Sequence, residues 1–398
     1  MVATALRLSA AAGARSTRRT FSDRTDVKIS VYGAGLVGRR TASVLARNKD
    51  HDVVLVSQTR TGHTLAGVTT AVGWPNPAAA GSSIVVLAVE SSKQWELARR
   101  LVDAGTDVIT TADDPSDVRQ LWGLDEQARM NGVSVVVGAA YSPGVSTLLA
   151  SYLVSRFDQV TSISTAQFGT GGPACARQHH RAMSTSAHDV DRGLLRPTRS
   201  GTGRELVWFP DPVGAADCYR AGLSDPFLLH QQFPRVERIR SRQAATRRDR
   251  LTARMPMLRP PHAEGLVGAV WAEVRGRVDG RVEHRVLAAT APQATGAAAM
   301  AAAFCELLIQ RSEGQLDSQS NAESRDTRPR RGAQSAATTR NLNSLLRHIS
   351  NDVRLWTYDG SQVVTNFGVV GPTSAARKWR VPTENPRTTP ISGRSHGR

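Results

Sequence analysis

The chain is poor in cysteine and has no long apolar run. Its 398 residues include three cysteines, Cys175, Cys218 and Cys305, which are too few and too scattered for a disulfide framework. Frameworks of that kind belong to small secreted domains, so we expect a reducing, cytoplasmic location. No stretch approaches the roughly 18 to 20 uncharged apolar residues that a membrane span requires. We therefore expect no membrane partner.

Aromatic residues are also scarce, at 5% of the chain, although the formal net charge is +17. The whole excess of positive charge lies in residues 1–26, 235–259 and 311–398. Sites for single-stranded nucleic acid combine basic grooves with stacking aromatics, and residues 235–259 contain no aromatic residue. The pattern favours a solvated, arginine-rich surface over a nucleic-acid groove. Residues 1–26 are predicted to form a disordered leader.

The region from Val27 to Gln58 carries the clearest motif. A short β-rich run is followed by Gly33-Ala34-Gly35-Leu36-Val37-Gly38, a helical stretch and a second apolar run. This order is typical of a dinucleotide-binding fold, in which Gly33 allows a tight turn, Gly35 lets the backbone approach a pyrophosphate, and Gly38 lets the helix pack on the strand. We expect the pyrophosphate at the start of the helix. The alternative is a purely structural turn.

The end of the second predicted strand lacks the acidic residue that NAD-preferring sites use to bind the ribose 2′-hydroxyl. Ser57 holds that place, and Arg60 follows three residues later. Since an arginine can pair with a 2′-phosphate, the sequence predicts NADP(H). NAD is the alternative if Arg60 is only a solvated loop residue.

Strands and helices then alternate up to about residue 150. Apolar runs predict strands at 83–89, 107–111 and 133–138, and helical patterns predict helices at 91–104 and 115–131. Such alternation predicts an α/β fold with a doubly wound parallel Rossmann sheet over residues 27–150. Ligands bind beyond the carboxyl ends of the strands of such sheets. We therefore expect Ala88 and Val89 beside the nicotinamide ribose, and the chain after Thr110 and Gly138 near the same site.

The stretch Tyr141-Ser142-Pro143-Gly144 follows one of these strand ends and leads into an apolar helix. Pro143 and Gly144 set a fixed turn whose backbone donors could hold a substrate carboxylate. A simple helix start is the equally open alternative.

Residues 151–310 predict a second, α+β domain for substrate binding or dimerisation. Residues 160–168 alternate like a half-exposed strand, Asp279-Gly280 predicts a hairpin, and 292–309 form an alanine-rich helix expected to pack back on the sheet. We expect a mainly antiparallel sheet. Residues 311–398 are predicted to be a low-complexity basic tail, disordered over 311–340, with a short helix at 341–349 and strand-like pieces in 353–370. We expect no role for this tail in chemistry.

The stretch Cys175-Ala176-Arg177-Gln178-His179-His180-Arg181 concentrates reactive side chains. An imidazole can move the proton that accompanies hydride transfer, and an arginine can hold a substrate carboxylate. We therefore predict that His179 or His180 carries the proton and that Arg177 is the carboxylate ligand. Three alternatives remain open: a zinc site, which the spacing alone does not favour, a thiol nucleophile, and purely structural imidazoles. No metal is expected.

Taken together, these motifs resemble the saccharopine dehydrogenase-like group of NAD(P)-binding oxidoreductases. The resemblance covers about Val27 to Ile309 and rests on the glycine motif, on the apolar run 84–89 and on Tyr141-Ser142-Pro143-Gly144, where the family typically has Asp-Pro-Gly. Ser142 replaces that acid. The stretch 169–180 is similar to a bacterial branch of the group.

The resemblance implies an NAD(P)-dependent oxidoreductase that transfers hydride to or from a small amino acid or imine bearing a carboxylate. One alternative is a non-catalytic NADP(H)-binding regulatory or interaction protein. A nucleic-acid-binding protein that uses residues 235–259 and the tail is a further one. The expected partner is a small-molecule substrate, and a homodimer through the second-domain sheet is plausible.

Overall fold

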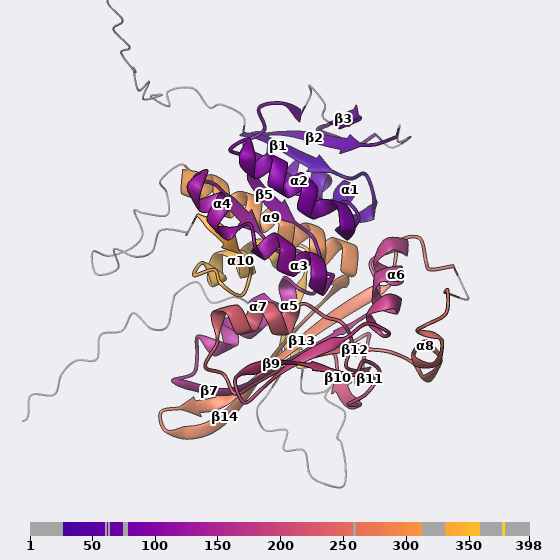
Figure 1. Cartoon of the computed structure of the whole chain (residues 1–398), viewed down its shortest axis with the longest axis vertical. Coiled ribbons are helices and arrows are strands. Elements are labelled where there is room, and N and C mark those ends of the chain that lie inside the picture. The colour runs from indigo at the N-terminus through magenta and orange to yellow at the C-terminus, as the bar shows by residue number, and fades with distance from the viewer. Residues whose placement is uncertain are drawn as a thin grey trace, which may run out of the picture.

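The computed structural model describes residues 27–59, 62, 64–74, 79–257, 260–312, 331–358 and the backbone of 376–378. The predicted leader and Arg60 lie outside these residues. The described chain forms two sheets with helices between and around them (Figure 1). None of the helices in the described ranges is long and apolar enough to cross a membrane.

The first sheet has seven strands in the order β15-β6-β5-β4-β1-β2-β3, and every neighbouring pair is parallel. The predicted doubly wound Rossmann sheet is therefore confirmed. Its strands are β1 (Val27–Tyr32), β2 (His51–Ser57), β3 (Val68–Val72), β4 (Ile84–Leu87), β5 (Asp107–Thr110), β6 (Ser134–Val136) and β15 (Gly332–Gln334). Its helices are α1 (Leu36–Leu45), α2 (Ser91–Asp103), α3 (Pro115–Trp122) and α4 (Asp125–Met130).

Both faces of this sheet are covered because neighbouring residues of a strand point to opposite sides. Ile29 and Val31 belong to one hydrophobic cluster, which includes residues of α1 and α9 (Gln293–Ser312). Tyr32 belongs to the other, with residues of α2, α3 and α4. The helix predicted at 115–131 is two helices, because the chain breaks at Gly123, a residue that is unfavourable inside a helix.

The second sheet has ten strands, and only the contact between β7 and β12 is parallel among the pairs described. The predicted mainly antiparallel sheet is confirmed. Its strands are β7 (Gln159–Phe168), β8 (Ala187–Asp191), β9 (Leu194–Thr198), β10 (Glu205–Trp208), β11 (Ala215–Tyr219), β12 (Arg238–Ala244), β13 (Val267–Val278), β14 (Arg281–Pro292), β16 (Arg354–Tyr358) and β17 (Ala376–Lys378). The remaining helices are α5 (Val145–Val154), α6 (Pro173–Ala182), α7 (Asp225–Gln232), α8 (Arg247–Thr252) and α10 (Leu342–Ile349).

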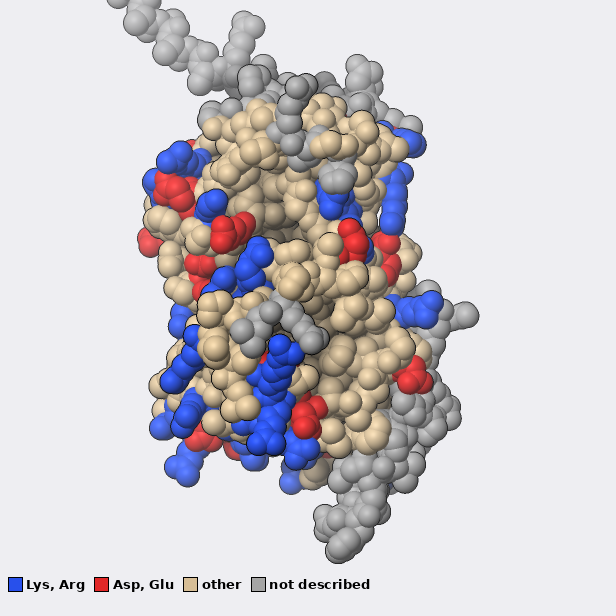
Figure 2. Space-filling view, turned by 90° about the vertical axis from the view of Figure 1, so that its right-hand side faces the viewer, with Lys and Arg blue, Asp and Glu red and all other residues tan. Residues whose placement is uncertain are grey.

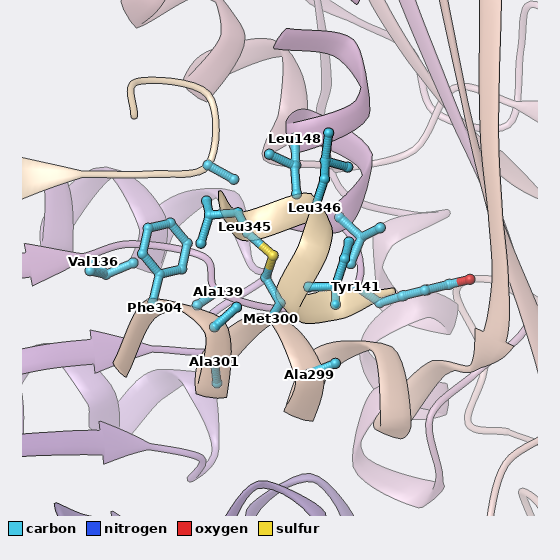
Figure 3. Packing of buried hydrophobic residues seen from close by; sticks show 14 of the residues in the cluster. Val136, Ala139, Tyr141, Leu148, Ala299, Met300, Ala301, Phe304, Leu345 and Leu346 are labelled. Atoms are coloured by element: carbon cyan, nitrogen blue, oxygen red, sulfur yellow. The ribbon is translucent and has the colours of Figure 1, made fainter. Parts of the chain in front are cut away.

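Helix α9 joins the two sheets and carries much of the core. It leaves the second sheet after β14 and packs against α1 of the first sheet (Figure 1). Met300 and Phe304 of α9 are fully buried and lie beside Leu345 and Leu346 of α10, as Figure 3 shows. The predicted alanine-rich helix is therefore an element of the central core.

The prediction of a low-complexity tail is wrong for residues 331–358. Strand β15 extends the first sheet beside β6, and β16 pairs with β14 of the second sheet. Leu345, Leu346 and Ile349 have helical spacing and are all fully buried, so this segment contributes apolar area that a disordered tail would leave in water. The predicted helix at 341–349 and the strand that starts in 353–370 are confirmed.

Part of the basic segment 235–259 is structural. Arg242 on β12 has 2% of its surface exposed, and its guanidinium donates to the Asp189 carboxylate at 3.0 Å. Arg220 binds the same carboxylate at 2.8 Å. On the face shown in Figure 2, Lys and Arg side chains are concentrated over the lower half. Arg242 is therefore a buried, paired residue and does not belong to the solvated arginine surface that was predicted for this segment.

Candidate active site

The three glycines of the motif have different surroundings. Gly33 has φ +111°, and a Cβ placed there would lie 2.3 Å from the carbonyl oxygen of Ala88. A Cβ on Gly38 would lie 1.8 Å from the carbonyl oxygen of Gly33. A Cβ on Gly35 would meet no atom within 4 Å. Gly33 and Gly38 are therefore required by the fold itself, whereas Gly35 faces open space at the start of α1.

That open space is a cavity of about 640 Å³ between the two sheets. Of the predicted cofactor residues, Gly33 to Val37, Ser57, Ala88 and Val89 all line it. Gly38 lies beneath the turn, against Gly33 and Ala88. The cavity is at the carboxyl ends of the first-sheet strands, and the helix α1 presents its free N–H groups there. The structure thus brings the predicted cofactor residues together around one opening.

The end of β2 forms one wall of the cavity. The Ser57 hydroxyl is buried and donates to the carbonyl of Thr59 at 2.5 Å, and Gln58 and Thr59 also line the cavity. No carboxylate is present in residues 57–59. The predicted contact of Arg60 with a 2′-phosphate lies outside the described residues.

Helix α6 carries the predicted proton carriers and carboxylate ligand on different sides. His179 is buried and Arg177 is exposed, and both line the cavity. His180 faces the other way, and its Nε2 lies 2.8 Å from the carbonyl oxygen of Met255. The structure brings His179 and Arg177 to this cavity and does not bring His180 there, because neighbouring residues of a helix point about 100° apart.

One carbonyl group fixes the orientation of His179. Its Nδ1 lies 3.1 Å from the oxygen of Gly169, which can only accept, so Nδ1 carries the proton and Nε2 has the lone pair. Nε2 lies 3.5 Å from Sγ of Cys175, one helical turn earlier. Burial lowers the pKa of His179, while the nearby Asp113 opposes this change. We therefore infer a neutral imidazole at pH 7.

Two residues near His179 were not predicted as site residues, Asp113 and Gln293. Asp113 follows the end of β5, and burial raises the pKa of its carboxyl group. Gln293 begins α9 and accepts a hydrogen bond from the thiol of Cys175 at 3.2 Å. Asp113 could have been found from the sequence, because the chain after Thr110 was predicted to lie at the site. Gln293 is distant in sequence from every motif and carried no signal.

The turn Tyr141 to Gly144 is a helix start rather than an anion site. The Gly144 N–H donates to the Thr147 hydroxyl at 3.3 Å, and the N–H of Ser146 donates to the carbonyl of Tyr141 at 3.2 Å. The N–H of Val145 is likewise bonded, at 3.2 Å from the oxygen of Ala140. The backbone donors expected to be free for a carboxylate are therefore occupied, and the prediction of an anion-binding turn is wrong.

Ser142, which replaces the acid of the family pattern, lies beside a carboxylate from another element. Its hydroxyl donates to Asp225 of α7 at 3.0 Å, and the hydroxyls of Ser146 and Thr165 donate to the same side chain at 2.5 and 3.4 Å. Burial raises the pKa of Asp225, and these hydroxyls partly offset that effect. The carboxylate joins the helices α5 and α7 to β7 beneath the cavity.

The fold and the cavity define an architecture: a parallel Rossmann sheet beside a mainly antiparallel sheet, with the cavity at the carboxyl ends of the parallel strands. No family model matches the sequence. Among solved structures, apo saccharopine dehydrogenase (L-Glu forming) of Saccharomyces cerevisiae is similar, with a TM-score of 0.57 and 13% identity over 83% of this chain and 100% of that one. The fold implied by the sequence resemblance is thereby confirmed.

Two further solved structures match with lower TM-scores. DAP dehydrogenase of C. glutamicum in complex with DAP has a TM-score of 0.43 and 12% identity, over 79% of this chain and 93% of that chain. An engineered D-amino acid dehydrogenase bound to NADP+ has a TM-score of 0.44 and 12% identity, over 79% and 94% of the two chains.

Proposed function

We propose that the protein is an NADP(H)-dependent oxidoreductase that transfers hydride to or from a small amino acid or imine bearing a carboxylate. The observation that carries the proposal is the open space at Gly35, at the start of α1 and on the wall of the cavity. A pyrophosphate needs close approach to the backbone at that point, together with the positive end of a helix dipole.

In this proposal the nicotinamide half of the cofactor lies toward Ala88 and Val89. Both line the cavity at the end of β4, next to Gly33. The other half extends along Ser57 at the end of β2, where the absence of an acid in residues 57–59 favours a 2′-phosphate over a free hydroxyl. Arg60 is the proposed partner of that phosphate. The nicotinamide supplies the hydride, and the protein supplies binding, orientation and proton transfer.

The substrate half of the site is proposed to use Arg177 and His179. Arg177 offers a guanidinium on the cavity wall, which can hold a carboxylate through two hydrogen bonds. His179 carries the Nε2 lone pair that can take a proton when an amine or hydroxyl is oxidised and return it in the reverse direction. An amino acid or imine is preferred because of the sequence resemblance and the fold shared with yeast saccharopine dehydrogenase.

The test is turnover with a matched pair of histidine variants. NADPH oxidation is followed with a panel of 2-oxo acids and ammonia or amino acids, and NADP+ reduction with the corresponding amino acids. His179→Gln should lower kcat by about 100-fold or more, whereas His180→Gln should leave it within about twofold, since His180 lies away from the cavity. Binding of NADPH without turnover on any member of the panel would instead favour the non-catalytic alternative.

A further inference from the structure

Three metal-ligand side chains meet on the wall of the cavity that the proposed proton transfer uses. One ligand atom from each of Asp113, Cys175 and His179 lies within 4.8 Å of the other two. They come from two separate parts of the fold, the loop after β5 and the buried side of α6. Cys175 and His179 are four residues apart, so a single helical turn places their side chains on one face.

Two of the separations between these donor atoms match those of a small tetrahedral site. Donor atoms 2.0 to 2.3 Å from a zinc ion lie about 3.3 to 3.8 Å from one another. Sγ of Cys175 is 3.5 Å from Nε2 of His179 and 3.2 Å from Oε1 of Gln293. The ligand atom of Asp113 lies within 4.8 Å of those of Cys175 and His179, so a movement of at most about 1 Å brings it into the same range.

The acceptor atoms of His179 and Gln293 both lie beside the sulfur of Cys175. The Gly169 carbonyl accepts from Nδ1 of His179 at 3.1 Å and from Nε2 of Gln293 at 2.8 Å. These bonds leave Nε2 of His179 and Oε1 of Gln293 as acceptors, and both face the sulfur of Cys175. A backbone carbonyl that holds the far nitrogen of a histidine is the usual outer support of a zinc ligand.

We infer that Asp113, Cys175 and His179, with Gln293 as the fourth donor, form a binding site for a divalent cation of the zinc class. Thiolate and imidazole donors favour zinc over magnesium or calcium. Binding replaces the thiol proton of Cys175 by the ion, and that proton leaves to solvent, with no change of oxidation state. Within the described part of the chain, no lysine or arginine forms an ion pair with Asp113 that would compete with the ion.

The site has a consequence for catalysis that rests on the proposed function. A cation on Nε2 of His179 occupies the lone pair that proton transfer needs, so zinc binding and turnover exclude each other. Zinc should therefore inhibit the enzyme and a chelator should restore it. This makes the cluster a metal-sensitive switch within the active site.

The test uses the full chain, freed of metal with a chelator and titrated with Co2+. A thiolate ligand gives a near-ultraviolet charge-transfer band, and four-coordinate geometry gives intense visible bands. We expect one ion per chain, displacement of cobalt by zinc, and release of one proton per ion in weak buffer. Cys175→Ser should remove the charge-transfer band, and Asp113→Asn and Gln293→Ala should each weaken binding by about tenfold or more.

His180→Gln is the matched control, because the neighbouring imidazole faces Met255 and should leave binding unchanged. The melting temperature of each metal-free variant shows whether it is folded, and Asp113→Asn provides a second variant if Cys175→Ser is unstable. Absence of a thiolate band in the folded wild type, or its survival in Cys175→Ser, would overturn the site. A cobalt signature in a protein whose metal-free form shows no dehydrogenase turnover would refute only the proposed function, whereas turnover unaffected by bound zinc would overturn the switch.

Discussion

The side chains of His179 and Gln293 donate to one shared acceptor, the carbonyl oxygen of Gly169, at 3.1 and 2.8 Å. The first residue lies on α6 and the second begins α9, so a single carbonyl aligns two elements that are more than a hundred residues apart in sequence. Gly169 has φ +91°, a conformation that suits glycine. The position of the imidazole therefore depends on how α9 meets the second sheet.

Replacement of Gln293 by leucine should destabilise the fold. The buried amide also donates to the carbonyl of Phe168 at 3.1 Å, so the variant leaves that acceptor without this donor. We expect a loss of about 1 to 3 kcal/mol in the free energy of unfolding, measured by urea denaturation. Gln120→Leu is the control, because that amide is exposed and bonds only to Ser116 in the described structure, and its effect should stay within about 0.5 kcal/mol.

The glycines of the motif should separate folding from cofactor binding. Gly33→Ala forces a residue with a side chain into a left-handed backbone conformation and brings its Cβ against the Ala88 carbonyl. We therefore expect a loss of more than about 2 kcal/mol in the free energy of unfolding. Gly35→Ala has free space and an ordinary φ of −69°, and should change stability by less than about 1 kcal/mol. Chemical denaturation of the two variants measures the difference. Equal losses would contradict the assignment of Gly35 to the cavity rather than to the fold.

Asp117 predicts a pH dependence of stability. Burial and the neighbouring Asp114 raise the pKa of its carboxyl group to about 6, above the value of about 3.9 in an unfolded chain. The folded state therefore binds more protons than the unfolded state between pH 4 and 6. The resulting contribution of Asp117 to the free energy of unfolding is present at pH 4 and is lost as the pH rises through 6. Asp117→Asn should gain about 1 kcal/mol relative to wild type on going from pH 4 to pH 7, after allowance for solvent screening.

That difference is measured by denaturant titration of both proteins at the two pH values. A variant whose stability follows wild type at both would show that Asp117 titrates normally.

The segment 331–358 should be required for stability. Leu346→Ala removes a fully buried side chain from the contact of α10 with α9, and we expect a loss of about 2 to 5 kcal/mol. Arg347→Ala, at the exposed neighbouring position, should stay within about 0.5 kcal/mol. Thermal unfolding of the pair measures the contrast. A small effect of Leu346→Ala would contradict the assignment of α10 to the core.

The first sheet was predictable because its signals are local. Ile29 and Val31 alternate with residues of the opposite face, and the glycine motif follows within a few positions. The pattern of strand, glycine turn and helix is therefore complete within one short stretch of sequence. The contribution of 331–358 was not predictable from composition. The three core residues of its helix α10, Leu345, Leu346 and Ile349, lie in a polar, arginine-rich sequence. They are buried against the faces of α5 and α9, which are distant in sequence.

The candidate site was predictable in part for the same reason. The cofactor residues lie in local motifs, and periodicity alone distinguishes His179 from His180 once the buried side of α6 is known. The buried side of α6 is the one on which His179 shares the Gly169 carbonyl with Gln293. No local sequence pattern specifies this contact. The backbone donors predicted to be free at the Pro143-Gly144 turn were misassigned, because local hydrogen bonds within the turn and its helix occupy them.

The most direct test of the account is a titration of the full chain with NADPH and with NADH, followed by intrinsic fluorescence and by thermal shift. A ligand that binds only the folded state raises the melting temperature by mass action. We predict binding of NADPH, weaker binding in Gly35→Ala, loss of binding in the folded Gly35→Asp variant, whose carboxylate would face the pyrophosphate, and a reduced preference for NADPH in Arg60→Ala. If neither nucleotide binds, or if Gly35→Asp binds as wild type does, the assignment of the cavity to a dinucleotide is wrong.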